Sequence, residues 1–200
     1  MKLFAFGAFA LASLAATGAV AQAQGPQNPG PAIPGVCVYF NSRAMAQSTA
    51  GQAVGARMEQ LAQEVRGELQ PYATAIQTEA QALQNGASTI PADQMNTRRQ
   101  ALQQRAQEAQ QLEGTRENEL RYTLSEQRRK MTEALEPILV QVYQERGCGI
   151  MIDRESVFMM NPAMDVTDLV IQRLNAALPT LSFSRMAVPV QQPAAAAPAR

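Results

Sequence analysis

The stretch ERGCGIMIDRESVFMMNPAMDVTDLVIQRLN, residues 145–175, interrupts a sequence that is otherwise typical of helix. Two glycines flank Cys148, and the apolar run IMID follows them directly. Arg154 and Glu155 then mark a turn before a second apolar run, SVFMM. Short runs of β-branched and large apolar residues between turn residues predict strands. We therefore expect two short strands here, over residues 150–153 and 156–160.

The end of the same stretch predicts a short helix, because its apolar residues recur at helical spacing until Pro179. Asp165 is placed to cap this helix, and Asp168, three residues later, occupies the second position of a capping box. Together with Asp153 these aspartates could instead form a carboxylate or metal site. A strand end and a helix cap explain them more simply.

A counterpart to these strands lies far away in the sequence. The run VCVYF, residues 36–40, is too short for a helix, and its β-branched and aromatic residues suit a buried strand. Because side chains alternate along a strand, Val36 and Val38 should face one way, and Cys37 and Tyr39 the other.

Residues 52–145 separate the two strand regions and predict long helices. Apolar side chains recur at spacings of three and four, with an eleven-residue repeat, as in Val54, Val65 and Ile76. This stripe is thin between Arg98 and Glu119, where Gln and charged residues dominate. Two helices of ~40–50 residues each would extend roughly 60–75 Å.

A turn at residues 85–93 divides this helical run into two. Asn85-Gly86 ends the first helix, Ser88 or Thr89 is expected to cap the second, and Pro91 suits its first turn. The result is an antiparallel hairpin, in which Pro71 should cause a kink.

An antiparallel hairpin brings its two ends together, so strands that are distant in sequence become neighbours. We therefore predict an α+β fold: a small β-body, residues 36–51 and 146–183, with a long protruding antiparallel α-helical coiled-coil hairpin over 52–145. A hairpin with so narrow an apolar stripe cannot form a globule alone, and it should project from the body as an arm.

Both ends of the sequence are expected to lie outside this fold. Lys2, an apolar run and two A-x-A sites predict a secretory signal peptide over residues 1–23, cleaved after Ala21 or Ala23. The alternative, a transmembrane anchor, would need a longer apolar run of ~20 residues. Residues 24–35, rich in Pro and Gly, predict a flexible leader, and residues 184–200 predict a disordered tail.

The composition argues against several classes of function. The sequence has no His, the commonest acid/base and metal ligand at neutral pH. No nucleophile–base pair, phosphate-binding loop or zinc spacing is present, so we expect neither an enzyme nor a cofactor or metal. Without Lys2, the chain has 16 basic and 17 acidic residues, a net charge of 16 − 17 = −1, which does not favour nucleic acid. No second apolar stretch is long enough to span a membrane.

Cys37 and Cys148 would be exported to an oxidising compartment, where a pair of cysteines can form a disulfide. They are 148 − 37 = 111 residues apart, but the predicted hairpin brings their surroundings together. A bridge requires that both side chains share a face, which strand alternation alone does not decide. Two small buried apolar residues are the other interpretation.

Two blocks of the sequence resemble the OmpH-like (Skp) family of periplasmic chaperones. The first, NSRAMAQSTAGQ at residues 41–52, follows the first predicted strand. The second, EPILVQVYQERGCGIMIDRESVFMMNPAMDVTDLVIQRLN at residues 136–175, contains the family's Pro-Ile, the glycine before the strand and the Asp-x-Thr-Asp that opens the final helix. The resemblance covers residues 36–176.

This resemblance implies a homotrimer in the periplasm, with three arms that enclose a cavity. Unfolded outer-membrane proteins would be held there without ATP, so that they do not aggregate. One body of this size is too small to bury its apolar strand residues well. We therefore expect six of them at the trimer interface: Val36, Val38, Ile150, Ile152, Val157 and Phe158.

The arm is close to neutral, with 11 basic and 13 acidic residues from Arg57 to Arg146. Arg98, Arg99 and Arg105 are expected to face the client, each contributing little alone. The alternative function is a structural coiled-coil spacer or tether of the envelope. It would need one continuous apolar seam, against which the thin stripe argues.

Overall fold

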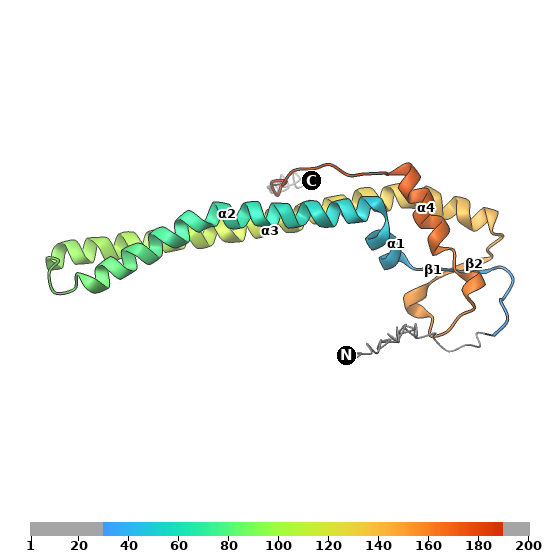
Figure 1. Ribbon diagram of the computed structural model, residues 1–200, viewed down its shortest axis with the longest axis horizontal. Helices are drawn as coiled ribbons and strands as arrows, with labels where there is room; N and C mark the ends of the chain where they lie inside the picture. The colour runs from blue at the N-terminus through green and yellow to red at the C-terminus, as the bar shows by residue number, and fades with distance from the viewer. Residues whose placement is uncertain (1–29, 190–200) are drawn as a thin grey trace, which may run out of the picture.

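The computed structural model describes residues 30–189. The predicted signal peptide, residues 1–23, lies outside this range, as do residues 24–29 of the predicted leader and 190–200 of the predicted tail. Within the described residues, two long helices lie side by side and project from a small body that contains both strands (Figure 1). The chain is mostly helical with a small strand pair, as the sequence predicts.

The arm consists of α2 (Thr49–Asn85) and α3 (Ala92–Glu145), which have 37 and 54 residues. At about 1.5 Å per residue, these helices extend roughly 55 and 80 Å. Both helices continue through their internal prolines, Pro71 and Pro137. The last turns of α3 run beside the body, which is why α3 is the longer helix and why its apolar stripe is densest there.

The turn between α2 and α3 differs from the expected capping. The amide of Gly86 ends α2 by donating to the carbonyl of Ala82 at 2.9 Å. Pro91 is the N-cap of α3 and no side chain caps that helix, so the predicted cap at Ser88 or Thr89 is wrong. The Thr89 hydroxyl instead donates to the carbonyl of Gly86 at 3.3 Å, inside the turn.

The body contains a parallel pair of strands, β1 (Val36–Tyr39) and β2 (Ile150–Asp153), paired from Val36 with Ile150 to Tyr39 with Asp153. Parallel pairing needs a long crossover, and here the whole arm supplies it. Helix α1 (Asn41–Gln47) joins β1 to α2. Two 3-10 helices, η1 (Arg154–Ser156) and η2 (Pro162–Met164), lead from β2 to the last helix, α4 (Thr167–Ala177).

Residues 156–160, which we expected to form a second strand after the arm, do not form a strand. The Asp153 carboxylate accepts a hydrogen bond from the amide of Glu155 at 2.9 Å, which starts η1. The chain thereby leaves the sheet, and SVFMM becomes an irregular loop. Its apolar residues reflect an apolar surface rather than a strand.

The start of α4 also differs in detail from the prediction. The N-cap is Val166, but the Asp165 carboxylate still accepts a hydrogen bond from the amide of Thr167, at 2.8 Å. Asp168 does not complete a capping box, because its carboxylate binds the guanidinium of Arg43. These aspartates therefore hold α1 and α4 together, and within residues 30–189 no group of His, Cys, Asp and Glu could hold a metal ion.

The main core lies where the end of α3 and α4 pack against each other and against β1. Cys37 and Tyr39 of β1 point into it, as the alternation predicts, and Val170 and Leu174 of α4 are fully buried. A second cluster continues from the body along the base of the arm, around Val54 and Met131.

The last described residues overturn part of the predicted disorder. Residues 178–189, which we name the strap, leave α4 and run extended along the arm (Figure 1). Residues 184–189 therefore do not belong to a disordered tail. Arg185 forms ion pairs with Glu68 and Glu119, and the amide of Met186 donates to the hydroxyl of Thr123 at 2.8 Å. These contacts hold residues that their Pro-rich composition suggested would be disordered.

Candidate functional site

The body has an open apolar face on one side of its two strands. Val36 and Val38 of β1 and Ile152 of β2 line a groove of about 400 Å³, together with Val157 and Met159 from the loop that follows. The opposite side of β1 is occupied by the core, so this groove is the free face of the sheet. Apolar surface of this kind marks an interaction site.

The six predicted interface residues divide into three groups. Phe158 is 94% exposed and Ile150 is 51% exposed, so both are available to a partner. Val36, Ile152 and Val157 are half-buried in the groove. Val38 differs, because it is only 1% exposed and its carbonyl accepts a hydrogen bond from the amide of Val166 at 2.9 Å. Val38 therefore packs mainly within its own chain.

The sheet also has an open edge. Within the described residues β2 pairs only with β1, whereas β1 additionally forms a bridge between Val38 and Asp165. The other edge of β2, the strand that begins at the exposed Ile150, therefore has no strand partner among the described residues. Such an edge is a template for pairing with another chain.

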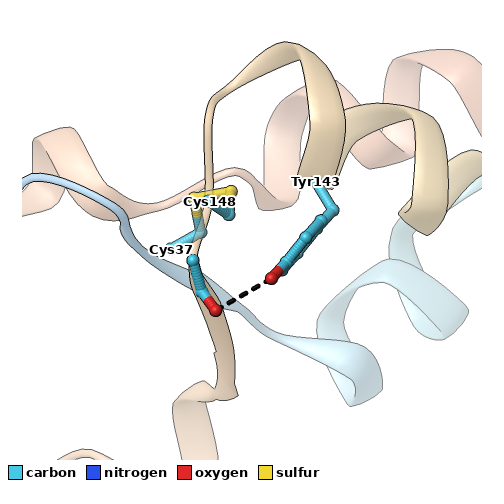
Figure 2. Close-up of a disulfide and its surroundings, with 4 residues drawn as sticks. Cys37, Tyr143 and Cys148 are labelled. Atoms are coloured by element: carbon cyan, nitrogen blue, oxygen red, sulfur yellow. Dashed lines mark hydrogen bonds between the residues drawn. A yellow bond between two sulfur atoms is a disulfide. The ribbon is translucent and has the colours of Figure 1, made fainter.

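A disulfide between Cys37 and Cys148 joins β1 to the loop between α3 and β2, with the Cα atoms 5.7 Å apart (Figure 2). Both cysteines are buried in the core. The loop is held in place by the Tyr143 hydroxyl, which donates to the carbonyl of Gly149 at 2.8 Å. The two ends of the arm are thus linked covalently at the body.

The loop geometry explains how Cys148 reaches the face of Cys37. Gly147 has a φ of 62°, a left-handed conformation that favours glycine, and it redirects the chain after α3. Cys148 precedes β2, so it is not bound by the alternation that places Ile150 and Ile152 on the opposite face. The sequence pattern therefore could not decide the pairing.

Burial alters one titratable group in the core. The pKa of Tyr39 is raised to about 12, first because the phenol is buried and second because the carboxylate of Asp153 is nearby. The Tyr39 hydroxyl donates to the side chain of Asn41 at 3.1 Å. Tyr39 is therefore a neutral structural residue at neutral pH.

The three arginines predicted to face the client differ in their surroundings. Arg98 donates to both carboxylate oxygens of Glu79 across the arm, at 2.7 and 2.9 Å, and so it is engaged within the chain. The hydrogen bond from Arg98 lowers the pKa of Glu79. Arg99 and Arg105 are exposed. Binding of a client to Arg99 or Arg105 would not require an ion pair between the two helices to break, as binding to Arg98 would.

Sequence reasoning missed the strap and the polar layer that it meets on the arm. This layer consists of Glu68 on α2 and Arg116 and Glu119 on α3, with the Arg116 nitrogens 2.7 and 3.0 Å from the two carboxylates. The available signal was the alternation of Leu181, Phe183 and Arg185 with small polar residues. The nearby prolines and alanines obscured it.

Comparisons with known proteins agree with this architecture. The family model for outer membrane protein (OmpH-like) matches residues 35–174. A crystal structure from Caulobacter crescentus CB15, described as a candidate outer membrane chaperone (OmpH-like), is 36% identical, covers 84% of this chain and 98% of its own, and has a TM-score of 0.75. No curated protein matches the sequence. Among residues 30–189, none of the helices has the length and apolar character needed to cross a membrane.

Proposed function

The chain belongs to the OmpH-like family of outer membrane proteins, and from this premise we propose that it is a periplasmic holdase chaperone. It would act as a homotrimer, bind unfolded outer-membrane proteins between its arms without ATP, and prevent their aggregation. Export through the predicted signal peptide, residues 1–23, would deliver it to the periplasm.

The observation that carries the proposal is the combination of a small body that exposes apolar residues with a long, polar arm. The body exposes Ile150, Phe158 and Met159, and one edge of β2 has no strand partner among the described residues, which suits self-association. The distal arm, by contrast, is joined by ion pairs such as Arg98–Glu79 and has few apolar residues to bury. Three bodies that associate through their exposed faces would leave three arms projecting around a common space.

The charges of the arm favour retention of the client by enclosure rather than by attraction to a single charged patch. Arg57, Arg98 and Arg116 are paired with carboxylates inside their own chain, so they contribute little net field. Exposed arginines such as Arg99 and Arg105 would each contribute only ~0–1 kcal/mol to client binding. We therefore infer that the client is retained by the walls of the cavity, with many weak contacts.

An aggregation assay tests the proposal. A urea-denatured outer-membrane β-barrel protein would be diluted with and without the chain, and light scattering would be followed over time. We expect suppression of scattering at a stoichiometry of three chains per client. A matched variant in which a short turn replaces residues 73–111 keeps the layer of Glu68, Arg116 and Glu119, and should stay trimeric but lose holding. Unchanged scattering with the full-length protein would refute the chaperone assignment.

A further inference from the structure

The strap has the side-chain pattern of a β-strand although it pairs with no strand in the described structure. Leu181, Phe183 and Arg185 are half-buried against the arm, whereas Ser182 and Ser184 between them are exposed. A period of two residues is that of an extended chain with one buried face. Leu181 and Phe183 pack on the second cluster, whose buried members are Ala50, Val54 and Met131.

The arm also holds the main chain of the strap. Arg57 Nε donates to the carbonyl oxygen of Phe183 at 3.1 Å, and the Thr123 hydroxyl oxygen accepts from the amide of Met186 at 2.8 Å. Every residue except proline offers both main-chain groups, so these two bonds do not depend on the strap's sequence. The arm thus binds main-chain groups of an extended segment, whatever its side chains are.

Charge adds a preference for a basic side chain at one position. Arg185 Nη2 lies 2.8 Å from Glu68 and its Nε 3.0 Å from Glu119. Arg116 is the other arginine paired with these two carboxylates. Without Arg185 the layer would hold two carboxylates against one guanidinium, an excess of negative charge that a basic residue would offset.

One fully buried side chain is not satisfied by the strap. Gln127 is 0% exposed, and its Oε1 has no hydrogen-bond partner among the described residues. Its Nε2 finds only the thioether sulfur of Met186, at 3.8 Å, which is a weak acceptor. A peptide group presented at this place could bond to both ends of the carboxamide, and a buried acceptor without a partner is costly.

We propose that the surface of the arm that the strap covers, formed by Arg57, Glu68, Glu119, Thr123 and Gln127 and here named the strap groove, binds an extended segment of an unfolded protein, and that the strap occupies it in cis until such a segment displaces it. The preferred ligand has apolar side chains at alternate positions followed by a basic residue. Transmembrane strands of β-barrels have this alternation. The identity of the ligand as a client rests on the proposed function, whereas the groove itself does not.

A tethered strap competes strongly, because its effective concentration reaches the millimolar range. The ligand affinity measured on the wild-type chain is the intrinsic affinity multiplied by the fraction of molecules in which the strap groove is open. Weakening the strap should therefore strengthen binding in trans. A strap that serves only as a brace would give the opposite result, since its loss would loosen the arm.

The test uses the full-length chain and a labelled peptide, LPTLSFSRMAVP, copied from residues 178–189. The variant Arg185→Gln removes both ion pairs of the strap, and the double variant Phe183→Asp with Arg185→Gln opens it further. We expect these variants to bind the peptide about three- to tenfold and more than tenfold tighter, respectively, than the wild type, as measured by fluorescence anisotropy. Circular dichroism and the melting temperature would show that each variant is folded.

The matched control is Arg121→Gln, which removes the same charge from an exposed site on α3 that pairs only with Glu117. It should bind the peptide like the wild type. A peptide of the same composition with its apolar residues made contiguous should bind weakly, and a strand peptide from an outer-membrane β-barrel should compete. Equal affinity of the wild-type and opened chains, or no binding to either, would overturn the proposal that the strap groove binds an extended segment.

The two proposals fail in different ways. If the wild-type chain suppresses barrel aggregation but the opened variants show no binding in trans, the groove inference is wrong and the holdase function stands. If the opened variants bind the peptide but the wild-type chain does not suppress aggregation, the groove is supported and the client assignment is refuted.

Discussion

Arg98 of α3 donates two hydrogen bonds to the carboxylate of Glu79 in α2, at 2.7 and 2.9 Å, in the part of the arm where the apolar stripe is thinnest. The pair links the two helices beside the buried apolar side chains of Leu83 and Met95. A bidentate guanidinium–carboxylate pair also favours one register of the two helices, because its two parallel hydrogen bonds add geometric specificity.

Arg98→Gln should therefore loosen the distal arm without unfolding the body. We expect faster amide hydrogen exchange around residues 76–83 and 94–102, and unchanged exchange in α4. The matched control is Arg99→Gln, the exposed neighbour, which should leave both regions unaffected. Equal exchange in the two variants would show that the pair does not hold the arm together.

The same pair predicts a dependence on pH. The pKa of Glu79 is lowered in the folded chain, chiefly by the hydrogen bond from Arg98. A depressed carboxyl pKa contributes stability above the ordinary value of 4.5, and this contribution is lost as pH falls through the lower folded value. Protection of the distal arm should thus be greater in the wild type than in Arg98→Gln at pH 7, and the difference should shrink below about pH 4.5. A constant difference across this range would contradict it.

The exposed body residues should control assembly. Ile150→Asp and Phe158→Asp each place a charge at an exposed apolar position of the body, where the desolvation penalty of burying it opposes association. We expect both variants to be folded monomers in size-exclusion chromatography with light scattering. Tyr72→Asp, at a 39% exposed position on the arm, is the control and should remain trimeric. Ile152 and Val38 are poorer choices, because their partial or full burial makes a folding defect hard to separate from an assembly defect.

Tyr39 should make the body sensitive to alkali. Its pKa of about 12 lies above the ordinary value of 10, so the folded chain keeps this proton while the unfolded chain loses it. Stability is therefore fully present below pH 10 and decreases as pH rises towards 12. Tyr39→Phe should remove this part of the alkaline loss, measured as the urea midpoint between pH 9 and 11. An identical decline in both proteins would show that other groups cause it.

Much of the fold followed from local patterns, and the exceptions have physical causes. The alternation of Val36 and Val38 with Cys37 and Tyr39 was correct, because β1 has a core on one side and an open groove on the other. The run SVFMM was misjudged as a strand, since an apolar loop that is exposed in one chain has the same composition as a buried strand. Phe158 is 94% exposed, so the apolar run indicated an exposed apolar surface and not a buried strand.

The strap was missed for a different reason. Its hydrogen bonds and ion pairs to the arm all join it to residues more than fifty positions away in sequence, such as Thr123 and Glu68, so no local pattern could reveal its partner. Three apolar side chains, Leu178, Leu181 and Phe183, one arginine and two main-chain hydrogen bonds hold it, amid residues that are typical of disorder. The ion pair of Arg98 could not be predicted for a similar reason, because its partner Glu79 lies on the other helix.

The disulfide between Cys37 and Cys148 should be the strongest single link between arm and body. It closes a loop with a sequence separation of 111 residues. Restricting so long a loop in the unfolded chain stabilises the fold by ~4–5 kcal/mol in the chain-entropy model, and by about 2–5 kcal/mol in measured cases. We expect protein from the periplasm to take up no alkylating agent before reduction and two equivalents after it, by intact mass. The double variant Cys37→Ala with Cys148→Ala should unfold at lower urea concentration than the oxidised wild type, whereas reductant should not shift the variant further. Two free thiols before reduction, or equal midpoints for the oxidised wild type and the variant, would show that the bridge does not stabilise the base of the arm.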